Sequence, residues 1–118
     1  MNPIDEWPSF LHVRKFDADW EDLGLNDRDM ARLQNVLVAD PEAGDVIAGT
    51  GGLRKVRFAR PGGGKSGSLR VCYALLPDHG LVLLMMVYEK NAVTDLTAAD
   101  RREVKRRLAH LKAGLDSE

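Results

Sequence analysis

The chain has 118 residues, of which 44% are hydrophobic and 30% are charged, with a formal net charge of −1. This composition is typical of a globular protein and excludes a disordered chain, and the length predicts one domain over residues 1–118. The longest apolar run, Leu81–Val87, is too short to cross a membrane, and the first ten residues lack a signal-peptide pattern. With a single cysteine, which allows no internal disulfide, we expect a cytoplasmic protein without membrane contact.

The charges are spread unevenly. Residues 1–45 carry 11 acidic and 4 basic side chains, whereas residues 46–90 carry 7 basic and 2 acidic ones. A basic block inside a nearly neutral chain predicts one localised site for an anion rather than a surface that coats nucleic acid. The acidic first part is interpreted either as the solvated faces of helices or as a surface for a basic partner.

The first half of the chain predicts a strand followed by two helices. Residues 10–15 alternate in polarity as in a strand, and apolar residues recur at helical spacing over 16–23. Asn26, with Asp29 three residues later, is typical of a helix cap, and Asp40-Pro41 ends the second helix. A short link between the two helices predicts a helical hairpin.

The second half predicts three strands and a helix. Runs rich in strand-forming residues cover 53–59, 69–76 and 81–88, and a turn at 77–80 makes the last two an antiparallel hairpin. The last run is apolar up to its final tyrosine, which predicts a central strand covered on both faces. A capped amphipathic helix begins after Thr97. The element order predicts an α+β fold with an N-terminal strand and helical hairpin, an antiparallel sheet and a C-terminal helix.

Common cofactor and metal motifs are missing from the sequence. The glycines at 49–52 and 62–67 fit neither a P-loop nor a dinucleotide-binding fingerprint, because no helix follows them. The three histidines lie far apart and lack ligand spacing, so we expect no metal and no cofactor. Cys72 lies inside a strand and is interpreted as an inert core residue.

The basic block contains the strongest candidate site. Because side chains alternate along a strand, Lys55 and Arg57 share one face while Val56 and Phe58 face the core. Antiparallel pairing is expected to bring Arg70 and the segment 88–90 beside them, in an acid-free pocket shaped for a ribose phosphate. The alternative is a solvated basic edge strand, whose charge prevents aggregation of sheets.

Several segments resemble a known family: Gly44–Ile47, Gly49–Arg57, the loop Gly62–Gly67, Leu69–Val71 and Tyr88–Asn91. They are similar to RelE/HigB-type toxins of bacterial type II toxin–antitoxin systems, most closely to the HigB branch and its phage-derived relatives, over residues 40–112. The resemblance implies the RelE-like fold, which agrees with the element order above.

The resemblance also implies a function. Such toxins are metal-independent endoribonucleases, hydrolases also called mRNA interferases, which inhibit translation by cleaving mRNA, usually in the ribosomal A site. The expected chemistry is attack of the RNA 2′-hydroxyl on the adjacent phosphate. The implied partners are mRNA, the ribosome and a cognate antitoxin with a helix-turn-helix DNA-binding domain. Two alternatives on the same fold are a non-cleaving RNA- or protein-binding module and a ParE-like gyrase poison.

The resemblance implies roles for the residues at positions that match the family's motifs. Arg57 and Arg70 are expected to stabilise the phosphate, because guanidinium groups keep their charge and bind phosphate with two donors. Lys55 and Lys90 are candidates for the general base and acid. Tyr88 is either a stacking or acid residue or a buried strand-end tyrosine, since the family's tyrosine near the start of the last helix has no counterpart here. The predicted catalytic set is Lys55, Arg57, Arg70, Tyr88 and Lys90, and the predicted RNA-binding set is Arg54, Arg60 and Lys65.

Overall fold

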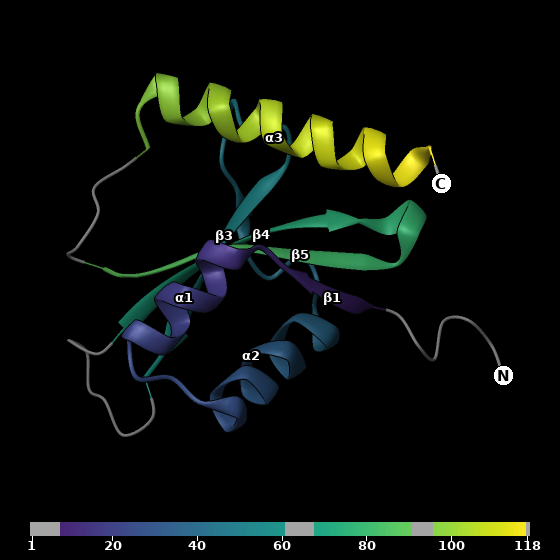
Figure 1. The fold of residues 1–118 in the computed structure, drawn as a ribbon. Coiled ribbons are helices and arrows are strands. Elements are labelled where there is room, and N and C mark those ends of the chain that lie inside the picture. Colours follow the sequence, from purple (N-terminus) through teal and green to yellow (C-terminus); the bar gives the residue numbers. More distant parts are fainter. Residues whose placement is uncertain (1–7, 61–67, 91–95, 118) are drawn as a thin grey trace, which may run out of the picture.

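The computed structural model describes residues 8–60, 68–90 and 96–117 (Figure 1). The elements in chain order are β1 (Ser9–His12), α1 (Arg14–Asp22), α2 (Asp27–Ala39), β2 (Asp45–Val46), β3 (Leu53–Ala59), β4 (Ser68–Leu76), the short 3₁₀ helix η3 (Pro77–His79), β5 (Leu81–Glu89) and α3 (Ala98–Asp116). The predicted α+β fold is confirmed, as are the three long strands and all three helices.

The five strands form one sheet in the order β1-β5-β4-β3-β2. As the continuous apolar run predicted, β5 is an interior strand, between β1 and β4. Three of the four pairings are antiparallel, but β1 pairs with β5 in parallel, so the expectation of a wholly antiparallel sheet is wrong at this edge. The hairpin turn fixes only the relative direction of the strands that it joins, and β1 is far from β5 along the sequence although the two are neighbours in the sheet.

Helices cover both faces of the sheet (Figure 1). On one face α1 and α2 bury Phe16, Leu33 and Leu37 against β4 and β5. On the other face Val104 and Leu108 of α3 pack on the sheet. The core residues of the sheet that meet α3 are Leu53, Cys72, Ala74, Leu76, Leu83 and Met85.

Both predicted helix caps are present as complete capping boxes. Asn26 accepts from the amide of Asp29 at 3.0 Å while its own amide donates to the Asp29 carboxylate at 2.9 Å. Thr97 and Asp100 make the same pair of bonds at the start of α3. Each box satisfies backbone donors that the first helical turn leaves without partners. Among the described helices, none has the length and apolarity needed to cross a bilayer.

Candidate active site on the sheet

One face of the sheet carries a row of polar side chains across its three longest strands. Arg57 of β3 lies directly opposite Arg70 of β4, which lies directly opposite Tyr88 of β5. Lys55 precedes Arg57 by two residues and therefore shares its face. Lys90 follows β5, and its amide donates to the carbonyl of Ser68 at 3.4 Å. Ser68 precedes Arg70 by two residues on β4. We refer to Lys55, Arg57, Arg70 and Lys90 as the basic cluster.

A β-bulge in β5 sets the direction of Tyr88. The register between β4 and β5 shifts by one residue beyond Cys72, and Met85 has no partner on β4. One extra residue reverses the alternation of the strand beyond it. Val87 therefore packs in the core under α1 and α2, and Tyr88 packs on the α3 side, on the face of the basic cluster.

The basic cluster is not neutralised by ion pairs in the described part of the chain. None of its four cations lies within 4.0 Å of a described carboxylate oxygen. Arg70 is held by the Ser68 hydroxyl at 3.1 Å and the Leu69 carbonyl at 3.2 Å. At a separation of about 5 Å and an effective dielectric constant of about 20, two like charges repel by about 3 kcal/mol before screening. A bound polyanion would relieve this repulsion.

The site is not acid-free at its edge, which corrects the expectation from the sequence. Asp45 of β2 lies directly opposite Lys55 of β3, and direct partners share a face of the sheet. The position of Asp45 could not be predicted, because β2 is only two residues long, too short for alternation to be seen. Its signal was the resemblance segment Gly44–Ile47, which contains it.

The hydroxyl of Tyr73 holds β2 against the sheet. It donates to the carbonyl of Pro41 at 2.7 Å and accepts from the amide of Gly44 at 2.9 Å. A Cβ at Gly44 would stand 2.9 Å from the backbone carbonyl of Lys55, so only glycine fits this approach. The chain just before Asp45 is therefore fixed beside Lys55.

Cys72 and Tyr88 contact each other beneath the basic cluster. The sulfur of Cys72 lies 3.9 Å from the Tyr88 hydroxyl, and Tyr88 is half-buried. Burial raises the pKa of the Cys72 thiol, and the opposing effects of the Tyr88 hydrogen bond and the Lys55 charge are smaller. The thiol therefore stays protonated near neutral pH and cannot serve as a thiolate nucleophile, in agreement with its interpretation as a core residue.

Comparisons with known proteins bear on the fold. A scan of the sequence against protein-family models finds no match. Among solved structures, the chain is similar to a double-arginine mutant of the E. coli toxin RelE in the free state, with a TM-score of 0.56 and 15% sequence identity. The similarity covers 86% of this chain and 98% of the other. The chain has a RelE-like fold. At this identity the similarity concerns the fold alone, and the HigB branch and a phage origin stay predictions.

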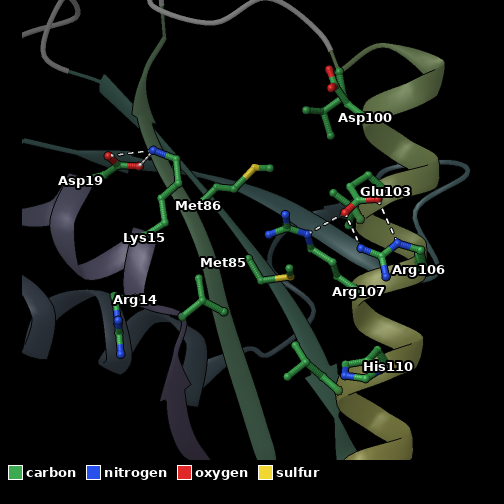
Figure 2. A pocket seen from close by; sticks show the side chains of 14 residues that line it. Arg14, Lys15, Asp19, Met85, Met86, Asp100, Glu103, Arg106, Arg107 and His110 are labelled. Carbon is green, nitrogen blue, oxygen red and sulfur yellow. Dashed lines mark hydrogen bonds and ion pairs between the residues drawn. The ribbon is translucent and has the colours of Figure 1, made fainter.

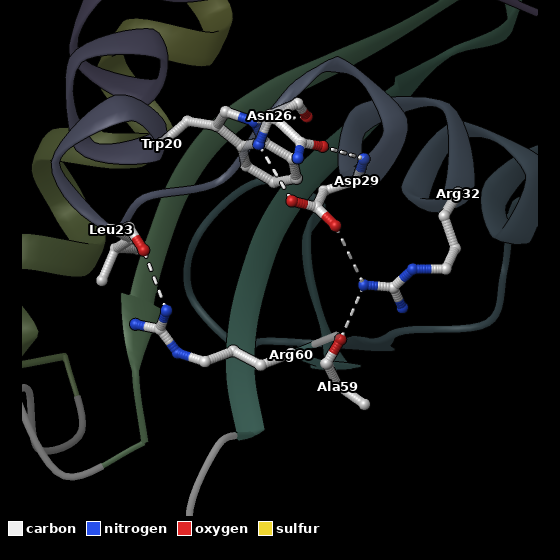
Figure 3. A network of polar contacts seen from close by, with 7 residues as sticks. All are labelled: Trp20, Leu23, Asn26, Asp29, Arg32, Ala59 and Arg60. Carbon is white, nitrogen blue, oxygen red and sulfur yellow. Dashed lines mark hydrogen bonds and ion pairs between the residues drawn. The ribbon is translucent and has the colours of Figure 1, made fainter. Parts of the chain in front are cut away.

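Two predicted RNA-binding residues of this RelE-like domain lie away from the basic cluster. Arg54 points to the opposite face, where it donates to the carbonyl of Gly44 at 2.7 Å and lies 3.6 Å from the Glu42 carboxylate. Arg60 donates to the carbonyl of Leu23 at 2.8 Å (Figure 3) and to the Glu89 carboxylate at 3.1 Å. Both guanidinium groups bind the chain itself, so we place neither in the proposed site.

The third predicted RNA-binding residue, Lys65, lies outside the described residues. In the described chain, no three histidine, cysteine or acidic side chains come together in a group able to hold a metal ion.

A groove lies between α1, which covers one face of the sheet, and α3, which covers the other (Figure 2). Its volume is about 830 Å³, with α1 on one side, α3 on the other and Met85 and Met86 of β5 between them. Met86 lies directly opposite Cys72, which lies directly opposite Lys55. The buried Cys72 of β4 therefore lies between the floor of the groove and Lys55. The sequence did not predict the groove, because it depends on how two helices distant in sequence are placed.

Proposed function

We propose that this chain is the toxin of a type II toxin–antitoxin system, an endoribonuclease that cleaves mRNA on the ribosome and so inhibits translation. The observation that carries the proposal is the alignment of Arg57, Arg70 and Tyr88 in one row across three strands, flanked by Lys55 and Lys90. The RelE-like fold supports the proposal, because the solved structure to which the chain is similar is that of a toxin.

The chemistry of RNA cleavage suits these side chains. RNA carries its own nucleophile, the 2′-hydroxyl next to each phosphate. The bond from O2′ to phosphorus forms while the bond from phosphorus to O5′ breaks, leaving a 2′,3′-cyclic phosphate and a 5′-hydroxyl. A base takes the proton of the 2′-hydroxyl, and an acid gives one to O5′. The protein therefore supplies positioning, charge and proton transfer.

We assign the roles as follows. Arg57 and Arg70 bind the non-bridging phosphate oxygens, where extra charge develops in the five-coordinate transition state. Lys55 and Lys90 flank this row and exchange the two protons. Tyr88 stacks on a base, or donates a proton in place of one lysine.

The ribosome completes the site in this proposal. The basic cluster contains few groups that act as strong bases near neutral pH, so alignment of the RNA for in-line attack must come largely from its surroundings. We expect weak cleavage of free RNA and strong cleavage of ribosome-bound mRNA. The expected regulator is an antitoxin with a helix-turn-helix domain, encoded beside the toxin.

Inducible expression tests the proposal. Wild type, Arg70→Ala and the control Lys112→Ala, an exposed cation on α3, are expressed in bacteria while growth is followed and mRNA 5′ ends are mapped. We expect wild type and the control to stop growth and create new 5′ ends inside reading frames, and Arg70→Ala to do neither.

Other outcomes separate the alternatives. Growth arrest without new mRNA ends, unchanged in Arg70→Ala, would indicate a gyrase poison or a non-cleaving module. Purified ribosomes with a defined mRNA, compared with the same mRNA alone, test ribosome dependence. Equal cleavage rates would contradict that part of the proposal.

A further inference from the structure

The guanidinium group of Arg60 joins segments that are far apart in the sequence. It donates to the carbonyl of Leu23 at 2.8 Å (Figure 3) and to the carboxylate of Glu89 at 3.1 Å. Leu23 is the C-cap of α1, and Glu89 is the last residue of β5. Arg60 itself directly follows β3. One side chain therefore connects the ends of β3, α1 and β5.

The contact with Leu23 fixes the guanidinium group. The last turn of α1 contains Glu21 and Asp22 and no basic side chain, although the negative end of a helix dipole favours a cation. Arg60 supplies that cation and binds a carbonyl at the helix end. An exposed ion pair contributes little when both side chains must be immobilised. Because Leu23 already holds the guanidinium group, less freedom is lost when Glu89 pairs with it.

The ion pair with Glu89 spans the middle strand of the candidate site. In the sheet, β4 lies between β3 and β5. Glu89 lies directly opposite Leu69, which is buried against α1 and α2, so both are on that face. Tyr88, one residue earlier, is on the other face and directly opposite Arg70. The pairing of Arg60 with Glu89 therefore joins β3 to β5 on the face opposite the basic cluster, next to the Arg70–Tyr88 pair.

The basic cluster tends to separate the strands that carry it. Arg57 and Arg70 lie directly opposite each other, and their like charges push β3 and β4 apart. The end of β5 is held weakly by its backbone, since the hydrogen bond from the Lys90 amide to the Ser68 carbonyl is long, at 3.4 Å. A tie on the opposite face resists this separation without placing a carboxylate beside the phosphate.

We propose that Arg60 is a positioning residue, which acts through Glu89 to hold the end of β5. Tyr88 then stays beside Arg70. The effect on catalysis rests on the proposed function. A displacement of about 1 Å in a catalytic site can slow a reaction about 100-fold. RNA affinity comes largely from the charge of the basic cluster, so loosening the strand end lowers kcat more than it changes KM.

Alanine variants of the ion pair test this role. Arg60→Ala removes both contacts, whereas Glu89→Ala removes only the ion pair and keeps the test informative if Arg60→Ala fails to fold. The control Arg107→Ala removes an exposed ion pair of 3.0 Å with Glu103 on α3, outside the basic cluster. For each variant, kcat and KM are measured with ribosome-bound mRNA. Amide hydrogen exchange of the ¹⁵N-labelled chain is measured without RNA.

We expect each single variant to lower kcat about tenfold and to change KM less than twofold, whereas the control changes neither. The double variant should be no slower than Arg60→Ala, because the two side chains act through one contact. Exchange at the amides of residues 88–90 should be at least tenfold faster in both single variants. The amides of residues 81–83, at the other end of β5, should exchange as in wild type.

Three results would overturn the proposal. The first is unchanged amide exchange at residues 88–90 in both variants. The second is a raised KM with an unchanged kcat, which would make Arg60 an RNA-binding residue. The third is a double variant in which the two effects multiply, which would mean that the side chains act independently.

Failure of the proposed function gives a different result. A wild type that does not cleave ribosome-bound mRNA, or an Arg70→Ala variant that cleaves it normally, would contradict the nuclease. The exchange measurement needs no RNA, so in that case it still decides whether Arg60 holds the end of β5.

Discussion

Asp45 and Lys55 lie directly opposite each other on the face of the sheet that carries the basic cluster. No ion pair joins them within 4.0 Å in the described structure, so the carboxylate lowers the positive potential of the site without fixing the lysine. Under the proposed function, this relationship predicts that Asp45 weakens RNA binding.

The substitution Asp45→Asn is expected to tighten RNA binding. In water, one charge about 6 Å from a phosphate contributes about 0.7 kcal/mol, which corresponds to about threefold in affinity. Fluorescence anisotropy with a short oligoribonucleotide at low salt measures the effect, which should fade at 0.5 M NaCl because salt screens surface charges. Weaker binding would instead indicate that Asp45 orients Lys55.

Replacing Arg57 by glutamine is expected to stabilise the fold while it impairs function. The exposed Arg57 lies directly opposite Arg70, and like charges in such pairs are destabilising by a few tenths of a kcal/mol to about 1 kcal/mol. Urea unfolding at low salt should show this gain, and mRNA cleavage on ribosomes should fall about 100-fold. Arg102→Gln on α3 is the control, with neither effect. A stabilised variant that cleaves normally would remove Arg57 from the site.

Loss of the Tyr73 hydroxyl is expected to loosen β2. Tyr73→Phe leaves the amide of Gly44 and the carbonyl of Pro41 without their partner. An unsatisfied buried polar group costs about 1–3 kcal/mol, and chemical denaturation should show a loss of this size. Hydrogen exchange should speed up at the amides of residues 44–46. An unchanged free energy of unfolding would mean that β2 is held by Arg54 instead.

The carboxylate of Glu103 should make stability depend on pH in the acid range. Its hydrogen bonds to Arg106 and Arg107 lower its pKa from 4.5 to about 2. A carboxyl group with a lowered pKa stabilises the folded state above its ordinary pKa and loses this contribution as the pH falls from 4.5 to about 2.

Thermal unfolding checks this expectation. Wild type should melt above Glu103→Gln at pH 6, and the difference should shrink toward zero by pH 2. Because Glu103 is exposed, 1 M NaCl should reduce the difference at every pH. A difference that does not vary with pH would contradict the pairing.

Regular patterns in the sequence predicted most of the fold. The alternation of Val56 and Phe58 with Lys55 and Arg57 fixed which side of β3 faces the core, and the cap at Asn26 placed the start of α2. The parallel pairing of β1 with β5 was missed, because pairings between strands distant in the chain leave no local signal. The strand β2 was missed because two residues are too few to show alternation.

The sequence predicted only part of the candidate site, because the face on which a side chain lies also depends on pairings that leave no local signal. Arg57 and Arg70 could be matched through neighbouring strands, but the face that Tyr88 occupies could not. The apolar run before it has no polar residues to reveal its alternation, so the bulge at Met85 is invisible in the sequence. Arg54 and Arg60 were chosen for their charge, whereas their carbonyl partners come from distant segments.

The bulge at Met85 decides which side chain at the end of β5 lies beside Arg70. If β5 kept Met85 but ran without the bulge, Met85 would pair with Cys72, and Val87 instead of Tyr88 would lie opposite Arg70. A phenol would then enter the apolar layer beneath α1 and α2, and an isopropyl group would stand beside Arg70. Deleting Met85 is expected to remove the bulge and keep Tyr88 opposite Arg70, because Leu84 and Met86 already pair with consecutive residues of β4. A transplant of this surface onto another sheet therefore needs either the bulge or a strand one residue shorter.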